Sequence, residues 1–386
     1  MAESKRKFLL AAKVHADVDV DPVPTAADNA FLAENPSPNF GIGSQQTNEG
    51  TGSLNTEAPI ITRTPDGIGF RTYAKGAGSA GAAPEFGALF RGAAFEEVIL
   101  EDPVPAAPEA CGAGGTTTTV ILGASASSTD QIYRGMPIVL SGTESGTASI
   151  IDYDGSTKTA TLSRAFAGAI GADTNYQIPA NVTYREASED IDQLAIYHWD
   201  DKRLRKFTNM RANALNMVFP TNGAGYFDWN FTGLNIADDD NAGGIPTAAI
   251  QANRPAPFNN GALLIDRKEM YASQTSIAMN FQLASPPNPN RPEGFNAPII
   301  NSRGPTLTID PLRSAKADFD PLSLARAGTK VPFLLYMHGA AGNRIMVSSA
   351  TLQITGYQDS NNQNLATEQL AGFFSGADSA LFISIF

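Results

Sequence analysis

The chain has 386 residues, and its 39 acidic side chains outnumber its 27 lysines and arginines, for a formal net charge of −12. This charge argues against a nucleic-acid-binding surface, because such a surface needs Lys and Arg to neutralise phosphates. A single cysteine, Cys111, excludes an intrachain disulfide and hence a framework built for an oxidising compartment, while the length suits two or three domains.

The N-terminal segment is predicted to form one strand, from Phe8 to Val14. Its basic start is followed by an apolar run of only five residues, which is too short for a signal peptide, and no run reaches membrane-spanning length. Asp17, Asp19 and Asp21 resemble the opening of a calcium loop, but Pro22 stands where such loops need glycine, so a solvated turn is expected.

Residues 33–60 are polar, with few apolar anchors. The segment is predicted to be a long loop or an extended hairpin, and in an assembling protein it could be an arm that becomes ordered on a neighbour.

Gly76, Gly78 and Gly81 match the spacing of a dinucleotide-binding loop and precede a predicted short helix over 84–95. The chain lacks the alternating strands and helices that a dinucleotide-binding fold requires, so the loop is interpreted as a flexible strand-to-helix connection.

A Pro/Ala/Gly-rich stretch over 101–115 is interpreted as a linker, and residues 116–180 show a compact all-β pattern. Asp154-Gly155 predicts a hairpin turn between the third and fourth strands of this pattern. We expect a small inserted all-β domain over 111–180; the alternative is a long β-extension of the main sheet.

Residues 194–219 read as three short strands with tight connections, and Leu215, Met217 and Phe219 share one face of the last. Trp199 and Trp229 lie in expected core strands. The segment 237–249, which contains Asp238, Asp239 and Asp240, is interpreted as a solvated linker, and the C-terminal residues 380–386 as a strand locked into a sheet.

The order strand, helix, hairpin, strand occurs twice, with the second helix predicted over 318–327, which indicates one β-rich unit used twice. We matched Tyr197 with Tyr336, residues 204–207 with 344–347, and Met217 with Ile354. The alternative is chance similarity between two β-meanders. The predicted organisation is a first unit from 1–110 and 181–236, the inserted domain 111–180, the linker 237–249, and a second unit over 250–386.

No pattern in the sequence predicts catalysis, a cofactor or a metal site. The three histidines, His15, His198 and His338, have no neighbouring Cys or carboxylate at metal-ligand spacing, and nucleophile, P-loop and zinc-protease motifs are missing. Glu189, Asp190 and Asp192 lie close together, but a glycosidase needs two carboxylates held across a cleft. The chain is therefore expected not to be an enzyme.

Several segments resemble the major tail tube proteins of long-tailed bacteriophages. They are 21–29 (Asp-Pro-Val-Pro-Thr-Ala-Ala-Asp-Asn), 78–92, 226–233 (Tyr-Phe-Asp-Trp-Asn-Phe-Thr-Gly), 325–329 and 341–344. The resemblance covers about 1–110 and 181–386, and the 116–180 segment resembles small β modules inserted in phage neck and tail proteins.

The resemblance implies a mainly β fold of duplicated sandwich units, each with a short flanking helix, that self-assembles into stacked rings. Three chains per ring would give pseudo-sixfold symmetry; six chains would fit a single-fold unit. The rings would form a virion tail tube, assembled in the host cytoplasm, that contacts the tail tip, tape measure and terminator. Genomic DNA would pass through an acidic channel without specific binding.

Two other functions stay open at this stage. One is another phage tail or neck protein, such as a distal tail, connector or decoration protein, which would differ in copy number. The other is a carbohydrate-binding or hydrolytic β-sandwich protein, which predicts a signal peptide and exposed aromatic side chains in a cleft.

Overall fold

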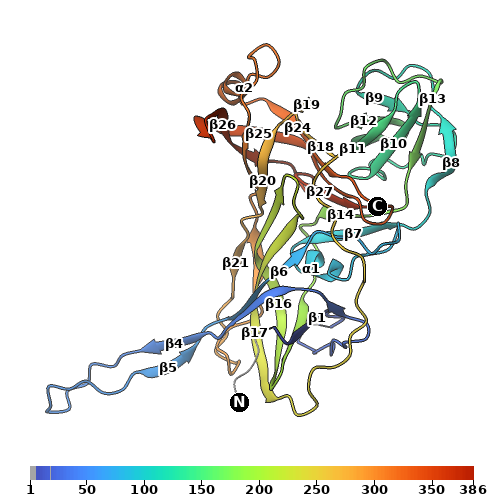
Figure 1. Ribbon diagram of the computed structural model, residues 1–386. Coiled ribbons are helices and arrows are strands. Elements are labelled where there is room, and N and C mark those ends of the chain that lie inside the picture. Colours follow the sequence, from blue (N-terminus) through green and yellow to red (C-terminus); the bar gives the residue numbers. More distant parts are fainter. Residues whose placement is uncertain (1–5, 18) are drawn as a thin grey trace.

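The computed structural model describes residues 6–17 and 19–386, and the protein is mainly β, as the sequence predicts. A large sheet system of 17 strands forms the body, and a separate six-stranded sheet lies at one end (Figure 1). Two short helices, α1 (Gly87–Arg91) and α2 (Pro321–Ala327), occur in this described part of the chain.

The first unit of the body begins with the N-terminal strand, which has the bounds that the sequence predicts. Its strands are β1 (Phe8–Val14), β2 (Ala30–Phe31), β3 (Glu34–Asn39), β6 (Asp66–Tyr73), β15 (Leu194–Asp200), β16 (Arg203–Pro220) and β17 (Tyr226–Asp240). They pair in the order β2-β1-β15-β16-β17-β6-β3.

The second unit repeats this pairing order. Its strands are β18 (Ala262–Ile265), β19 (Lys268–Glu269), β20 (Ala272–Ala278), β23 (Thr306–Pro311), β24 (Lys330–Met337), β25 (Ile345–Asn362), β26 (Leu365–Phe374) and β27 (Phe382–Ile385). The order β19-β18-β24-β25-β26-β23-β20 matches that of the first unit strand for strand. β26 and β27 together correspond to the long β17, because both pair with β25.

The residue matches that we drew between the units are wrong in register. Both hairpins carry the same β-bulge, between Leu194 and Ile196 opposite β16 and between Val331 and Phe333 opposite β25. Aligning the bulges makes Trp199, not Tyr197, the counterpart of Tyr336, and shifts the other matches as well. Bulges insert a residue into one strand, so apolar alternation alone cannot fix the alignment across them.

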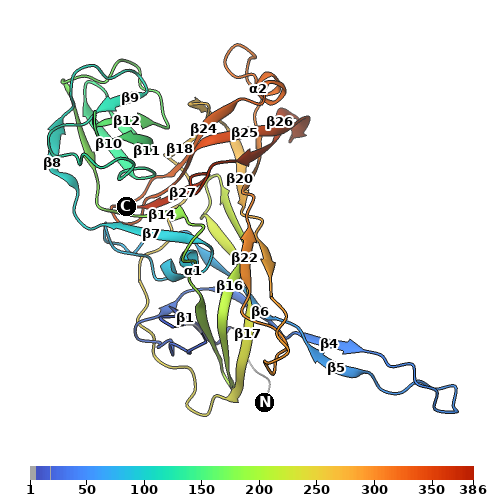
Figure 2. The same cartoon turned by 180° about the vertical axis from the view of Figure 1, so that it is seen from behind.

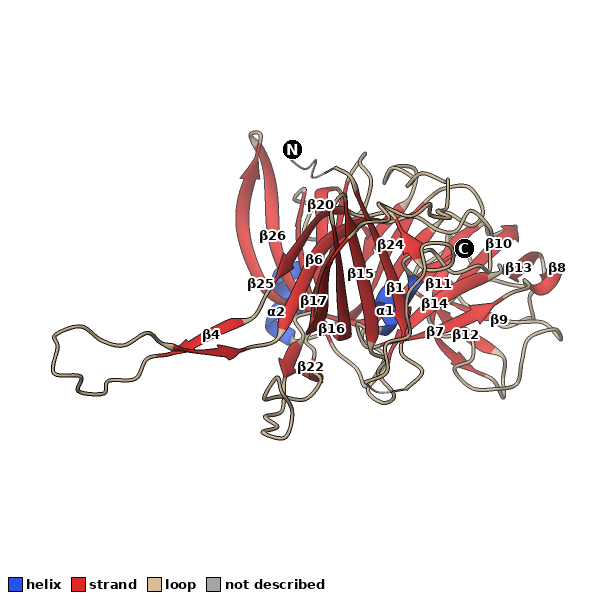
Figure 3. Ribbon diagram, turned by 90° about the horizontal axis from the view of Figure 1, so that it is seen from below, coloured by secondary structure: helices blue, strands red, loops and turns tan. Residues whose placement is uncertain are grey.

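Each unit also carries a hairpin between its third and fourth main strands. In the first it is the arm, residues 40–65, with β4 (Ile42–Gln45) and β5 (Ile60–Arg63), which protrudes far from the body (Figures 1 and 3). In the second it is β21 (Gln282–Ala284) and β22 (Ile299–Ser302), which lies along the body (Figure 2). Of the two alternatives for residues 33–60, the structure has the extended hairpin.

The six-stranded sheet is built from one continuous stretch of chain. Its strands are β8 (Val104–Ala110), β9 (Thr119–Ile121), β10 (Pro137–Gly142), β11 (Gly146–Asp154), β12 (Thr159–Leu162) and β13 (Thr174–Ile178). It has its own apolar core. A hydrogen bond of 2.7 Å between the buried Ser149 and Ser348 hydroxyls links it to the second unit. β7 (Phe95–Leu100) and β14 (Asn181–Glu186) lead into and out of it.

Three predictions about connections are wrong. Residues 104–110, assigned to a linker, form β8; Asp238–Asp240, assigned to a solvated linker, end β17; and residues 194–219 form two strands instead of three, since β16 runs unbroken for 18 residues. The acidic end of β17 is paired with the basic start of β16, for example Arg203 with Asp238 at 2.7 Å. Pairs of opposite charge on neighbouring strands stabilise this end of β17 as a strand, although its own sequence, taken alone, favours a loop.

Candidate assembly interface

The two units join through two strand pairs, β14 with β27 and β16 with β20. The second pair makes a continuous eight-stranded antiparallel sheet. Its order is β3-β6-β17-β16-β20-β23-β26-β25. Backbone bonds from Thr221 N to Ser273 O (2.8 Å) and from Met279 N to Leu215 O (3.0 Å) flank this junction. Hydrogen-bonded positions alternate in an antiparallel ladder. Met217 opposite Ile277 and Phe219 opposite Thr275 are therefore the hydrogen-bonded pairs.

One free edge of this sheet is β3, the counterpart of β20. It pairs with β6 on one side, with Pro38 opposite Ile68, and has no strand on the other side in the described chain. Pro38 occupies the position of Ile277, and Pro36, within a register shift between Glu34 and Ser37, that of Thr275. The backbone groups of Thr275 and Ile277 point at β16. The outer edge of β3 therefore offers the two proline carbonyls as acceptors and no N–H at either position.

The other free edge is the C-terminal half of β25, the counterpart of the half of β16 that pairs with β20. β25 turns into β26 at Gln363 and Asn364, whose φ angles of 53° and 65° fit a two-residue type I′ turn closed by the pair Asn362 and Leu365. Asn362 directs its N–H and C=O groups toward β26, and this direction alternates along a strand. Asn361 and Asp359 therefore direct their N–H and C=O groups outward, away from β26.

The face of the eight-stranded sheet away from the core is polar. Its neutral side chains are amides and hydroxyls for the most part, among them Asn216, Asn230, Thr232, Gln274, Ser276, Thr306, Thr308, Gln358, Ser360 and Gln369. The opposite face buries the apolar positions of the same strands, such as Met217, Trp229 and Ile277. This alternation is the pattern of a sheet with one solvated side.

Few charges lie on this polar face. Arg71 donates to both carboxylate oxygens of Asp228, at 2.6 and 3.0 Å, and its guanidinium lies 3.8 Å from the ring centre of Tyr226. Glu34 lies on the same side, where its hydrogen bond raises the pKa of Tyr73, and Asp310 accepts from Ser273 at 3.3 Å. Arg211, which lies opposite Thr232, is on this face as well and donates to the Pro298 carbonyl. Three carboxylates against two arginines leave the face weakly acidic.

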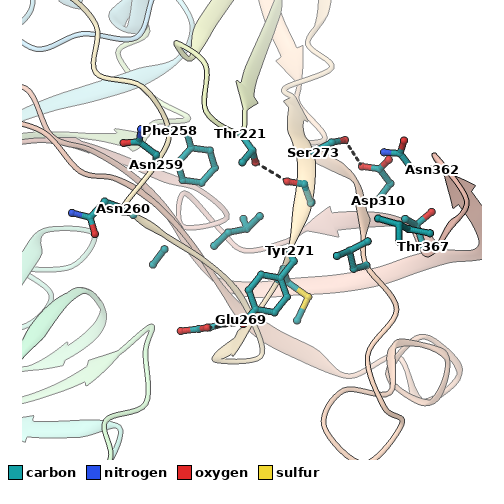
Figure 4. Close-up of a pocket in the computed structure, with 17 residues that line it drawn as sticks. Thr221, Phe258, Asn259, Asn260, Glu269, Tyr271, Ser273, Asp310, Asn362 and Thr367 are labelled. Atoms are coloured by element: carbon teal, nitrogen blue, oxygen red, sulfur yellow. Dashed lines mark hydrogen bonds between the residues drawn. The ribbon is translucent and has the colours of Figure 1, made fainter.

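A cleft of about 550 Å³ lies beside the outer end of this sheet (Figure 4). Phe258, Tyr271 and Leu365 supply much of its apolar lining. Tyr271 is 64% exposed, and its hydroxyl donates to Glu269 at 3.1 Å. This is an exposed aromatic side chain in a cleft, the feature that the carbohydrate-binding alternative predicts; both tryptophans, by contrast, are buried in strands.

The acidic group Glu189, Asp190 and Asp192 lines a second cleft. Asp192 is held by Arg91 at 2.7 Å. Nearby, Glu186 is buried, accepts from the Ala380 N–H at 2.8 Å and lies 3.6 Å from Arg303; burial raises its pKa. Asp192 and Glu186 therefore hold α1, β14 and the C-terminal segment together, through ion pairs with Arg91 and Arg303 and the hydrogen bond from Ala380.

The structure does not bring the three histidines together. His15 contacts the Thr208 hydroxyl at 3.1 Å, His198 lies 3.0 Å from Asp200, and the exposed His338 contacts the Tyr336 hydroxyl at 3.1 Å. Within 6–17 and 19–386, no three His, Cys, Asp or Glu side chains are grouped so that they could hold a metal ion.

Two of the three aspartates that resemble a calcium loop, Asp19 and Asp21, have protein partners. Asp19 forms an ion pair with Arg291 of the second unit and accepts from Asn209 at 2.8 Å, and Asp21 accepts from the Tyr197 hydroxyl. The Arg291 guanidinium lowers the pKa of Asp19. Asp17 and Asp19 are exposed in a bend and a turn, as expected, but the sequence carried no signal for a partner of Asp19 that lies 272 residues away.

The glycine loop at Gly76 joins the two units. A Cβ at Gly76 would lie 2.0 Å from the Gly342 carbonyl, and the Gly76 N–H donates to the Asn343 side chain at 2.8 Å. Next to it, Lys75 and Glu85 form a buried ion pair at 3.0 Å. Glycine is needed here for close backbone approach, which agrees with a structural role for this loop.

No protein family model matches this chain, and no curated protein sequence shows significant similarity to it. None of the helices in the described residues has the length and apolar character needed to cross a membrane.

Proposed function

We propose that this chain is a structural virion protein that self-assembles into stacked rings and forms the tail tube of a long-tailed bacteriophage. The observation that supports this function best is the β16–β20 junction. Two units of like topology are joined edge to edge within the chain, and the same two kinds of edge, β3 and β25, are left without a strand partner at the ends of the sheet.

A second copy of the chain offers the complement of each free edge. Repeating one heterologous contact produces a closed ring when the rotation closes, and closure removes the exposed strand edges that otherwise promote aggregation. Because each chain carries two units, a ring of three chains would contain six. The same protein would then contact tail tip, tape measure and terminator proteins at the two ends of the tube.

The polar face of the eight-stranded sheet suits the wall of a DNA channel. Glu34, Asp228 and Asp310 exceed Arg71 and Arg211 in charge by one, so the wall would repel phosphates weakly, over a Debye length of about 8 Å in physiological salt. Amides and hydroxyls offer no fixed positive charge to retain the backbone. DNA would slide past such a wall without specific binding.

Electron microscopy of the purified protein, with its mass measured in solution, tests this function. Long uniform tubes, or rings of three chains, are expected. A monomer at high concentration, both alone and with a tail initiation complex added, would overturn the proposal. A single ring that never stacks would favour a connector or distal tail protein instead.

A further inference from the structure

We infer that successive copies join in one direction and in one register: the free half of β25 in one copy pairs antiparallel with β3 of the next, with Ser360 opposite Ser37. This inference rests on the proposed self-assembly and specifies the contact that would produce it. It follows from transferring the internal β16–β20 junction to the two edges that have no partner.

The register of β25 relative to β16 is fixed by two bulges. At the first, Met210 corresponds to Leu352; at the second, between Ala212 and Ala214 in β16 and between Ile354 and Gly356 in β25, Ala212 corresponds to Ile354. Both pairs are separated by the same 142 positions. Val218 of β16 therefore corresponds to Ser360 of β25.

The register of β3 relative to β20 follows from their shared neighbours. Ile68 pairs with Phe231, which lies opposite Ala212. Leu307 pairs with Gly372, which lies opposite Ile354. Because Ala212 corresponds to Ile354, Ile68 and Leu307 are equivalent. Pro38 faces Ile68 and Ile277 faces Leu307, which makes Ser37 the counterpart of Ser276. Since Val218 lies opposite Ser276 in the internal junction, Ser360 would lie opposite Ser37 of the next copy.

In this register the outward N–H groups of β25 find acceptors on β3, whereas the outward carbonyls of Asp359 and Asn361 find no backbone donor. Asp359 would face Pro38 and Asn361 would face Pro36, so the outward N–H groups of β25 would donate to the outward proline carbonyls. Two β3 edges could not form such a ladder with each other, because neither has donors at these positions. The prolines thus disfavour a symmetric contact and favour a head-to-tail one.

The arm gives a second, separate reason for the same neighbour. In the second unit the corresponding hairpin crosses β16: Leu283 and Ile300 pack against the core, and Arg211 donates to the Pro298 carbonyl at 3.0 Å. In the arm, Ile42, Ile60 and Ile61 are 74%, 55% and 66% exposed. The same placement between copies would lay these isoleucines over β25 of the neighbour.

Disulfide cross-linking of the double variant S37C/S360C tests the register. Ser37 and Ser360 would form a non-hydrogen-bonded pair, with Cα atoms about 4.5 Å apart, within the range of a disulfide. The only native thiol, Cys111, is buried. Oxidation of the assembled variant is expected to give covalent closed rings on a non-reducing gel, and a mixture of the two single variants only covalent dimers.

The matched control is S37C/Q358C, which shifts one cysteine by two residues along the same face. Its Cα atoms would be about 7–8 Å apart, so cross-linking should fall at least tenfold. Equal cross-linking of both variants, or assembled tubes without any cross-link, would overturn the register and leave the proposed function standing. Covalent dimers of S360C alone would overturn the direction. Failure of the wild-type chain to assemble would overturn both.

Discussion

At the scale of single residues, His198 shows how the two units have diverged. It is buried on β15, where the second unit has Leu335, and its neighbours are Phe8 on β1, Asp200 on its own strand and Arg205 on β16. Burial lowers the pKa of His198 below 6.5, although the nearby Asp200 opposes the shift. The folded chain therefore favours the neutral imidazole.

This predicts a stability that depends on pH. The unfolded chain binds the proton at a higher pH than the folded one, so the contribution of neutral His198 is complete above pH of about 6.5 and is lost as the pH falls below it. The variant His198→Leu carries the residue that the second unit has at this position. When the pH is lowered from 7.5 to 5.5, its unfolding free energy should fall by less than that of wild type.

Urea unfolding at the two pH values measures the difference. His338→Gln, at an exposed histidine, is the control and should behave as wild type does. An identical loss of stability in His198→Leu and wild type would contradict the prediction that burial lowers the pKa of His198 in the folded chain relative to the unfolded one.

At the scale of elements, the two helices differ in how far the sequence specifies them. α2 begins at Pro321 after the N-cap Asp320, which accepts from the Ser323 N–H, and it ends at Gly328 with φ of 64°. These are local signals, and the predicted helix over 318–327 is close to the observed one. α1 has no side-chain cap and spans only Gly87–Arg91, within the predicted 84–95, so its tertiary contacts must hold it.

The contacts of Phe90 show what holds α1. This buried ring lies 4.5 Å from the ring of Tyr184 and 5.1 Å from that of Trp229, centre to centre. Phe90→Ala should lower the unfolding free energy by about 3–5 kcal/mol, because it leaves a cavity among aromatic side chains. Chemical denaturation measures this loss.

The control lies on the other helix. Leu324 of α2 is only partly buried, so Leu324→Ala should cost about 1 kcal/mol. Similar losses in the two variants would contradict the view that α1 depends on tertiary packing far more than α2 does.

At the scale of the whole molecule, the sequence predicted the mainly β class, the repeated order of elements and the terminal strand, because these follow from alternation and turn residues. It could not predict the junction of β16 with β20, since strand pairing across some 60 residues leaves no local pattern. The free edges of β3 and β25 become visible only when that junction is known. For the same reason the sequence indicates the repeat but does not specify its register, which depends on the bulges.

The arm provides the last prediction, which separates folding from assembly. Residues 43–62 make no contact with the main core, and the isoleucines of β4 and β5 are exposed. Replacing 43–62 by an Asn-Gly turn, with Ile42 and Arg63 as the closing pair, should therefore change the unfolding free energy by less than about 1 kcal/mol. If the arm crosses β25 of a neighbouring copy, the same variant should fail to form rings at concentrations where wild type assembles. Analytical ultracentrifugation distinguishes monomers, rings and tubes.

The comparable shortening of the β21–β22 hairpin is the control: it removes Leu283 and Ile300 from the core, and should cost about 1–3 kcal/mol of unfolding free energy. Rings that form normally but do not stack would place the arm between rings, and would contradict the contact with β25.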